Sequence, residues 1–162
     1  MKIRKYNNSD FEELKDLVAE FRVFLSSLKS IDKKPDYVSA AKELNTYIDK
    51  KYPIFISEIN QKIVGYIVCR IEDQVVWLES LYVLPDYRNK NIGSALFEKA
   101  EKISEELNCE TLYHWVHPNN HRMIKFLEKQ GYDVLNLIEI RKKRKDEEIK
   151  SKVKVNEHEF KY

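Results

Sequence analysis

The stretch of sequence that decides the fold is Leu81–Phe97, which reads LYVLPDYRNKNIGSALF. A strand-like run ends in it, a polar loop follows, and a helix begins. The first turn of a helix exposes N–H groups at the positive end of the helix dipole, and Arg88 and Lys90 add two cations. Asn91 tolerates a positive φ, and Gly93 has no Cβ to keep a phosphate away from the backbone. These properties predict an anion-binding loop, with an ordinary capped connection as the alternative.

On the N-terminal side of this run, the period of the apolar residues changes from helical to strand-like after Pro53. Spacings of three and four predict a first helix, opened by a capping box of Ser9 and Glu12, and a second that starts at Pro35 or Asp36. Alternation after Pro53 predicts strands that follow one another closely, which favours an antiparallel meander. The expected elements are strands over 2–6, 54–59, 62–71 and 75–84, and helices from 9 to about 28 and from 35 to 52.

On the C-terminal side, strands and helices alternate. Gly131 stands where a left-handed glycine commonly ends a helix. The expected elements are a helix from about Ile92 to Leu107, a strand over Thr111–Val116, a helix from the break at Pro118 to Lys129–Gln130, and a last strand over Tyr132–Ile140. The order β-α-α-β-β-β-α-β-α-β predicts an α/β (α+β) fold, with a mixed, mostly antiparallel sheet flanked by helices.

Two blocks of the sequence resemble the GNAT acetyltransferase superfamily. Arg88–Gly93, RNKNIG, is similar to the family's acetyl-coenzyme A loop, Arg/Gln-x-x-Gly-x-Gly/Ala, and its approach Leu81–Tyr87 reads as the typical Leu-Tyr-Val-x-Pro-x-Tyr. Val116–Tyr132 resembles the family's Val-x-x-x-Asn-x-x-Ala-Ile-x-Phe-Tyr-x-Lys-x-Gly-Phe. The resemblance covers about residues 1–141 as an acetyltransferase domain, and it leaves residues 142–162 as a charged extension.

The resemblance implies an N-acetyltransferase, in which an amine directly attacks acetyl-CoA in a ternary complex. The thioester would lie where the strand before the loop and the strand ending at Val116 splay apart. The main chain of Leu81–Val83 would pair with the pantetheine arm, the amides of Arg88–Ser94 would hold the pyrophosphate, and Asn120 would hydrogen-bond the arm. The implied cofactor-binding residues are Leu81, Tyr82, Val83, Arg88, Asn89, Lys90, Asn91, Ile92, Gly93, Ser94 and Asn120.

Two positions depart from the family pattern. Asn91 replaces the first loop glycine, which the left-handed conformation of asparagine can accommodate. Leu127 stands where many members keep a tyrosine that protonates the leaving thiolate. Since leucine cannot donate a proton, another group supplies it, or the thiolate leaves unassisted, or the chain binds acetyl-CoA without efficient turnover. The alternative function is therefore a non-catalytic acetyl-CoA-binding sensor or regulatory module.

The acid–base candidates are Glu79 and His117. Glu79 lies four residues ahead of Val83, among mostly apolar neighbours, where related enzymes often place a base glutamate. His117 titrates near neutral pH and could act as a relay or an acid. The alternatives are an exposed strand carboxylate and an ordinary loop histidine. The amine acceptor stays open between a peptide α-amine, a lysine and a small amine.

The composition bounds the remaining classes. A chain of 162 residues suits one domain, and no apolar run approaches the ~18 residues of a membrane span. Cys69 and Cys109 are isolated, which favours a reducing, cytoplasmic setting. The spacing of His114, His117 and His121 does not favour a metal site, because strand residues three apart face opposite sides.

The C-terminal extension carries a basic run, 141–145, directly followed by the acidic residues 146–148. The acids largely neutralise the run, which argues against nucleic-acid binding. Alternating residues from Ile149 to Val155 predict a final strand that closes the open edge of the sheet, in its own chain or in a partner's. A homodimer is therefore allowed.

Overall fold

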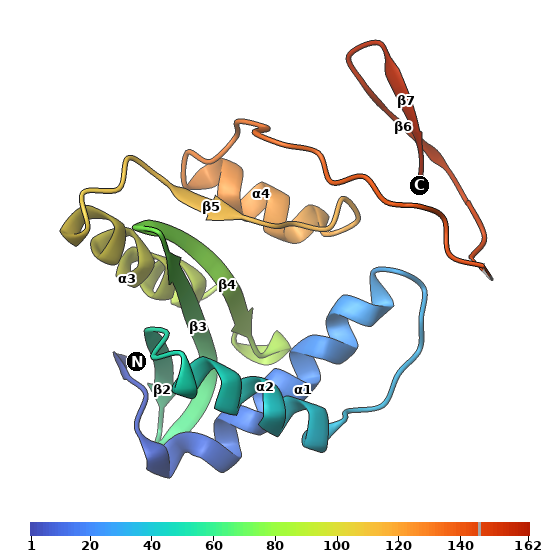
Figure 1. Ribbon diagram of the computed structural model, residues 1–162. Coiled ribbons are helices and arrows are strands. Elements are labelled where there is room, and N and C mark those ends of the chain that lie inside the picture. Colours follow the sequence, from blue (N-terminus) through green and yellow to red (C-terminus); the bar gives the residue numbers. More distant parts are fainter. Residues whose placement is uncertain (146) are drawn as a thin grey trace. The chain divides into compact units, whose positions relative to one another are not determined.

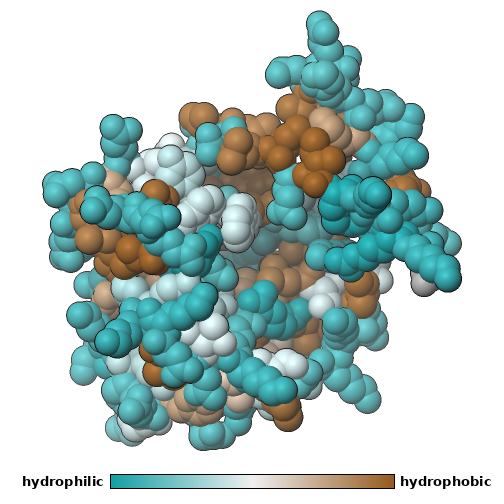
Figure 2. Space-filling model, in the orientation of Figure 1, coloured by the Kyte–Doolittle hydropathy of each residue, from teal (hydrophilic) through white to brown (hydrophobic). Residues whose placement is uncertain are grey.

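The computed structural model describes residues 1–145 and 147–162 (Figure 1). They form two compact units, Met1–Gly131 and Tyr132–Tyr162. Hydrophilic side chains dominate the face seen in Figure 2, as expected of a chain in which 35% of the residues are charged. No helix in the described part of the chain has the length and apolar character needed to cross a membrane.

The first unit is built on a five-stranded sheet in the order β1-β2-β3-β4-β5. All neighbours are antiparallel except β4 and β5, which are parallel. The mixed, mostly antiparallel sheet predicted from the sequence is confirmed. Its strands are β1 (Lys2–Lys5), β2 (Ile54–Ile59), β3 (Lys62–Glu72), β4 (Val75–Val83) and β5 (Leu112–His114).

Helices cover both faces of this sheet. The buried residues of α1 and α2 form one apolar core with strand residues that include Tyr66 of β3 and Tyr82 of β4. Gly65, next to Tyr66 and therefore on the opposite face, lies against Leu96 of α3. The helices are α1 (Phe11–Ser27), α2 (Tyr37–Asp49), α3 (Ile92–Glu106) and α4 (His121–Lys129), with single 3-10 turns η1 (Asn8–Asp10) and η2 (Pro85–Tyr87).

The start of α1 differs from the prediction of a Ser9–Glu12 capping box. Asn7 is the capping residue: its Oδ1 accepts the N–H of Ser9 at 2.9 Å, and Asp10 Oδ2 accepts the N–H of Asn7 at 2.8 Å. Arg4 of β1 holds Asp10 through an ion pair of 2.7 Å. The box shifted because Asp10 is buried and paired with the cation of Arg4, whereas Glu12 is exposed.

The last strand predicted over 132–140 is wrong: these residues have no regular secondary structure. Val134, Leu135, Leu137 and Ile140 are all exposed. An alternating apolar run shows that a segment could pair, but it does not supply the neighbouring strand that the pairing needs.

The extension ends in a hairpin rather than in a single strand added to the main sheet. Strands β6 (Lys152–Val155) and β7 (His158–Lys161) pair antiparallel in a sheet of their own. Asn156, with φ of 53°, makes the reversal between them. The expected edge-closing strand is therefore replaced, within this structure, by pairing of the segment with itself.

Candidate active site

The parallel ladder between β4 and β5 is short and stops inside β4. Its pairs are Val76↔Leu112, Trp77↔Tyr113 and Leu78↔His114, and no pair follows. The remaining residues of β4, Glu79 to Val83, have no pairing partner in β5. The splay expected from the sequence is thus present, and it begins at Glu79.

A β-bulge coincides with the start of this opening. Val68 of β3 pairs with Ser80, but the next residue, Cys69, pairs with Leu78. Glu79 is therefore the extra residue on β4. A bulge bends its strand and redirects a side chain, so the carboxylate of Glu79 is presented at the point where β4 and β5 separate.

The loop before α3 has the left-handed conformation expected at Asn91, and Asn89 adopts it as well. Asn89 and Asn91 both lie in the left-handed region, with φ of 59° and 60°. Asn91 is the N-cap of α3 and makes no side-chain capping bond. The first-turn N–H groups of Ile92, Gly93 and Ser94 have no intrahelical acceptor, so the helix N-terminus is a candidate anion site.

Gly93 is not required by the packing of the protein. A Cβ placed on it would lie 3.5 Å from the ring of Phe126, which is ordinary van der Waals contact, and its φ is not positive. The glycine therefore leaves open space on the helix terminus that the fold does not use. Space of this kind fits the close approach of a phosphate group.

The side chain of Arg88, one of the two cations of the loop, is turned inward. Its Nε donates to the carbonyl of Val83 at 2.7 Å, and its guanidinium lies 5.6 Å from the Phe24 ring and 5.4 Å from the Tyr82 ring. Burial chiefly lowers the pKa of Arg88. Its backbone N–H is bonded to the carbonyl of Pro85 at 3.2 Å, so Arg88 holds the loop in place.

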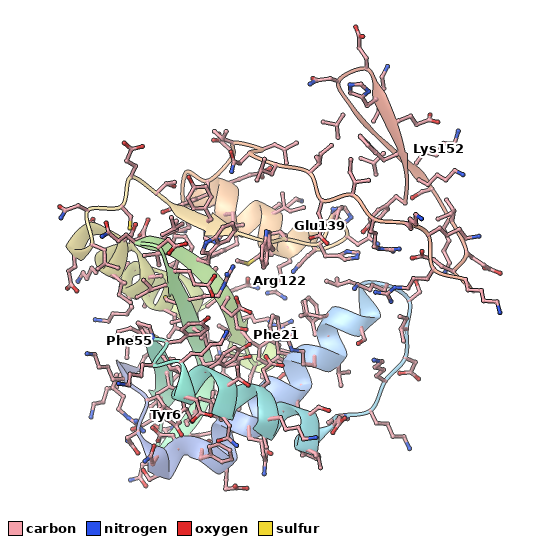
Figure 3. All side chains as sticks on the ribbon, viewed as in Figure 1. Tyr6, Phe21, Phe55, Arg122, Glu139 and Lys152 are labelled. Carbon is pink, nitrogen blue, oxygen red and sulfur yellow. The ribbon has the colours of Figure 1, made fainter. Side chains whose placement is uncertain are left out.

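A cation that the sequence analysis missed comes from α4. Arg122, labelled in Figure 3, donates from Nη2 to Asn89 Oδ1 at 3.4 Å. Its charge also contributes to lowering the pKa of Arg88. The only signal in the sequence is its place in the second family block, two residues after Asn120. The side chain of Asn120 caps α4, with Oδ1 accepting the N–H of Met123 at 3.2 Å.

Glu79 is held by Arg70 of β3. The Nε of Arg70 donates to Glu79 Oε2 at 3.1 Å, and its Nη1 donates to Glu72 Oε2 at 2.6 Å. The guanidinium lies 5.0 Å from the ring of Trp77 and 4.9 Å from that of Trp115. Glu79 is about one-quarter exposed, so solvent can reach this carboxylate, which Arg70 holds in place.

His117 lies in the turn between β5 and α4. Its Nδ1 accepts the N–H of Asn119 at 3.3 Å, and its carbonyl accepts the N–H of Asn120 at 2.7 Å. Burial, with a smaller contribution from the charge of Lys29, lowers the pKa of His117. The neutral imidazole is therefore favoured at neutral pH.

Two cavities flank the N-terminal side of the loop, between α1 and η2. The larger, about 410 Å³, includes Glu13, Asp16, Glu20 and Asp86 in its lining, and the smaller, about 280 Å³, includes Phe24, Tyr82 and Arg88. Glu79 lines neither of them. Among the described residues no group of three or more His, Cys, Asp or Glu side chains could hold a metal ion.

Comparison with known proteins identifies the family. Residues 13–132 match the model of the acetyltransferase (GNAT) family. A protein of Archaeoglobus fulgidus, described as an uncharacterized N-acetyltransferase, is 28% identical over 143 residues, which cover 80% of this chain and 91% of that protein. The probable N-acetyltransferase san of Drosophila melanogaster is 28% identical over 130 residues, 68% of this chain and 71% of its own.

The fold has relatives among solved structures. The PaiA N-acetyltransferase of Thermoplasma acidophilum, solved in complex with coenzyme A, matches with a TM-score of 0.68 and 24% identity, over 80% of this chain and 87% of that one. The family match spans most of the chain, so the protein belongs to the GNAT acetyltransferase family. It is an acetyltransferase, and acetyl-CoA is its cosubstrate.

Proposed function

We propose that the protein transfers the acetyl group of acetyl-CoA to an amine by direct attack in a ternary complex. Acetyl-CoA supplies an activated thioester. The nitrogen of the amine forms a bond to the acetyl carbon, the carbon–sulfur bond breaks, and the thiolate of coenzyme A takes up a proton. The ammonium form of the acceptor must first lose a proton, so the site needs a base.

Glu79 is the base in this proposal. The observation that carries it is the bulge: the extra residue of β4 is a carboxylate, and it stands where the β4–β5 ladder ends. Arg70 fixes the direction of that carboxylate with a single hydrogen bond, which leaves Glu79 Oε1 to accept the proton, directly or through water. His117 is the second candidate, as a relay, through its Nε2.

The cofactor would be held chiefly by main-chain groups. Leu81–Val83 lies beyond the end of the parallel ladder and would pair with the pantetheine arm. The N–H groups of Asn89–Ser94 would hold the pyrophosphate, since that of Arg88 is already bonded to Pro85. Lys90 and Arg122 would add positive charge, and the side-chain amide of Asn120 would reach the arm.

We assign the activity to residues 1–141, with 142–162 as an extension outside the catalytic part. Free Cys69 and Cys109 favour a reducing, cytoplasmic setting. The edge position of β5 leaves a homodimer as a proposal, which the mass of the protein in solution would test.

The experiment that tests the activity is coenzyme A release with a panel of amines, including peptides with a free α-amine, lysine derivatives and small amines. The expected result is release above the rate of acetyl-CoA hydrolysis for at least one class, with the acetylated amine identified by mass. Release no faster than hydrolysis with every acceptor would contradict the proposed function.

A second candidate function, a non-catalytic acetyl-CoA sensor, is favoured by one observation. Leu127, buried in α4, cannot supply the proton that a tyrosine supplies in many relatives. The Leu127→Tyr variant separates the two, with Leu127→Phe as the control for size. In an enzyme that needs no acid at this position, the two variants have equal turnover. A large gain with tyrosine alone, from a wild type that barely turns over, would favour the sensor.

A further inference from the structure

The guanidinium of Arg70, which comes from β3, contacts Glu79 and Trp77 of β4 and Trp115, which follows β5. The side chain is only 15% exposed, and it stacks against Trp77 and Trp115, within the range of cation–π contact. Trp115 follows the last residue of β5 and is itself 71% exposed. A large aromatic ring is thus held in solvent beside the proposed base, where an acceptor would enter.

The hydrogen bonds of Arg70 are incomplete. Nε donates to Glu79 and Nη1 donates to Glu72, whose Oε1 also accepts from the hydroxyl of Tyr52 at 3.1 Å. Nη2, between these two donors, is buried and has no hydrogen-bond partner within residues 1–145 and 147–162. A buried donor without an acceptor is costly, and proteins usually satisfy it.

A purely anchoring role does not account for this arrangement. An arginine that serves only to hold Glu79 would form a bidentate pair, with Nε and Nη2 on the two carboxylate oxygens. Instead, each carboxylate takes one nitrogen, and the nitrogen between them is left for another acceptor. Since Nη2 and Nε belong to one rigid plane, an oxygen bound to Nη2 lies beside the carboxylate of Glu79.

We infer that Nη2 of Arg70 binds an oxygen atom of the amine acceptor, which reaches this buried nitrogen when the side chains that cover it move aside. Resting on the proposed function, this inference names the acceptor class: an amine with a carbonyl or carboxylate oxygen on the adjacent carbon, as in a peptide or amino-acid α-amine. Such an oxygen is a few bonds from the nitrogen, so one acceptor reaches Arg70 and Glu79 together. A simple alkylamine leaves the donor of Arg70 unsatisfied, and a site of this kind discriminates strongly against the analogue that lacks the partner.

A matched pair of acceptors tests this inference. L-Alaninamide and isopropylamine differ by one group, because a carboxamide in the first replaces a methyl in the second. The measured quantity is the ratio of their kcat/KM values in the wild type, in Arg70→Gln and in Arg70→Lys. Comparing this ratio between proteins cancels the different basicity of the two amines. Glu72→Gln, which removes the other carboxylate partner of Arg70, is the control.

The wild type is expected to prefer the amide by about tenfold or more, and Arg70→Gln to lose most of that preference. Arg70→Lys should keep part of it, because an ammonium also donates, and Glu72→Gln should keep all of it. If Arg70 only positions Glu79, the Gln variant slows both acceptors equally and the ratio is unchanged, which overturns the inference. A wild type without preference overturns it as well.

A binding measurement keeps the inference testable apart from catalysis and from the folding of variants. The acetylated products, N-acetyl-alaninamide and N-isopropylacetamide, are titrated into the wild type loaded with coenzyme A. Tighter binding of the first is expected, and equal binding contradicts the inference. If neither amine nor any other acceptor is acetylated, the proposed function fails, while this comparison still decides whether the acceptor oxygen is recognised.

Discussion

The proposed cofactor side and the proposed acceptor side of the opening between β4 and β5 consist of different chemical groups. On the cofactor side, the loop 89–94 offers main-chain N–H groups, placed by the left-handed Asn89 and Asn91. On the acceptor side, the chemistry lies in the side chains of Arg70 and Glu79 from two neighbouring strands. Binding by main-chain N–H groups depends on the backbone conformation, whereas chemistry by side chains depends on the identity of each residue.

This difference explains how the loop conformation is kept although one family position has changed. Asn91 replaces a glycine, yet it adopts a φ of 60° and begins α3 with its N–H groups exposed. No main-chain group could replace Glu79 in its proposed role, because none could accept the proton that the acceptor amine loses. The two sides should therefore respond differently to mutation. Mutations on the acceptor side should lower catalysis, and mutations on the cofactor side should weaken the binding of acetyl-CoA.

The largest expected effect is that of Glu79→Gln. The variant keeps the shape of the side chain and its contact with Arg70 but removes the base, so kcat/KM should fall by about 100-fold or more. The affinity for acetyl-CoA should stay within about twofold, because the cofactor side is untouched. Glu72→Gln, which changes the other carboxylate on Arg70, is the control and should keep most of the activity. Equal losses in the two variants would show that Glu79 acts only through Arg70.

Gly93→Asp should change binding and stability in opposite directions. A carboxylate in the first turn of α3 interacts favourably with the helix dipole, so the melting temperature should hold or rise. The same charge repels a phosphate, so the dissociation constant of acetyl-CoA should rise by about tenfold or more. Gly65→Ala is the contrast: its Cβ would lie 2.9 Å from the carbonyl oxygen of Tyr82, and about 1–3 kcal/mol of stability should be lost. Unchanged acetyl-CoA affinity in Gly93→Asp would place the phosphates elsewhere.

Arg122→Gln tests whether the charge of Arg122 contributes to the binding of acetyl-CoA. If its charge serves the pyrophosphate, the affinity for acetyl-CoA should fall by about fivefold, and the loss should shrink at high salt. Lys102→Gln removes the same charge from an exposed position about 15 Å along α3, and it should have no effect. Calorimetric titration at two salt concentrations measures both variants. If Arg122→Gln and Lys102→Gln had equal effects, Arg122 would act only through the net charge of the protein.

His117→Gln should have the smallest effect. The lowered pKa of His117 keeps the imidazole neutral at pH 7, where it can relay a proton, and protonation at lower pH removes that ability. The variant should therefore lose less than about threefold in kcat/KM at neutral pH. If His117 relays the proton, the wild-type profile should fall as the pH drops through that lowered pKa, and this fall should be absent in the variant. A 100-fold loss at pH 7 would make His117 the principal base instead.

The sequence was informative where a short local pattern determines a conformation. The loop before α3, the left-handed Gly131 with φ of 87°, and the meander of β2 to β4 follow from neighbouring residues. The arrangement around Arg70 does not, because its contacts with Glu79 and Trp115 depend on strand register and on where the parallel ladder ends. No local pattern reports a register set by a bulge.

The two errors in the secondary structure have the same cause. The strand expected over 132–140 lacks a neighbour, although its residues alternate as a strand's would. The capping box lies at Asn7 and Asp10, at the start of the η1 turn that leads into α1, because Arg4, on another element, fixes Asp10. In each case a residue distant in sequence decided between two locally acceptable conformations.

The most direct measurement of the central claim is a crystal structure of the protein with coenzyme A bound. We predict that the pyrophosphate binds the N–H groups of Ile92–Ser94 and that the pantetheine arm lies along Leu81–Val83. The sulfur should lie in the opening where Glu79 leaves the ladder, with the carboxylate of Glu79 or a water bonded to it within ~3–4 Å of the acceptor position. A cofactor bound outside this opening, or Glu79 directed away from the sulfur, would contradict the account.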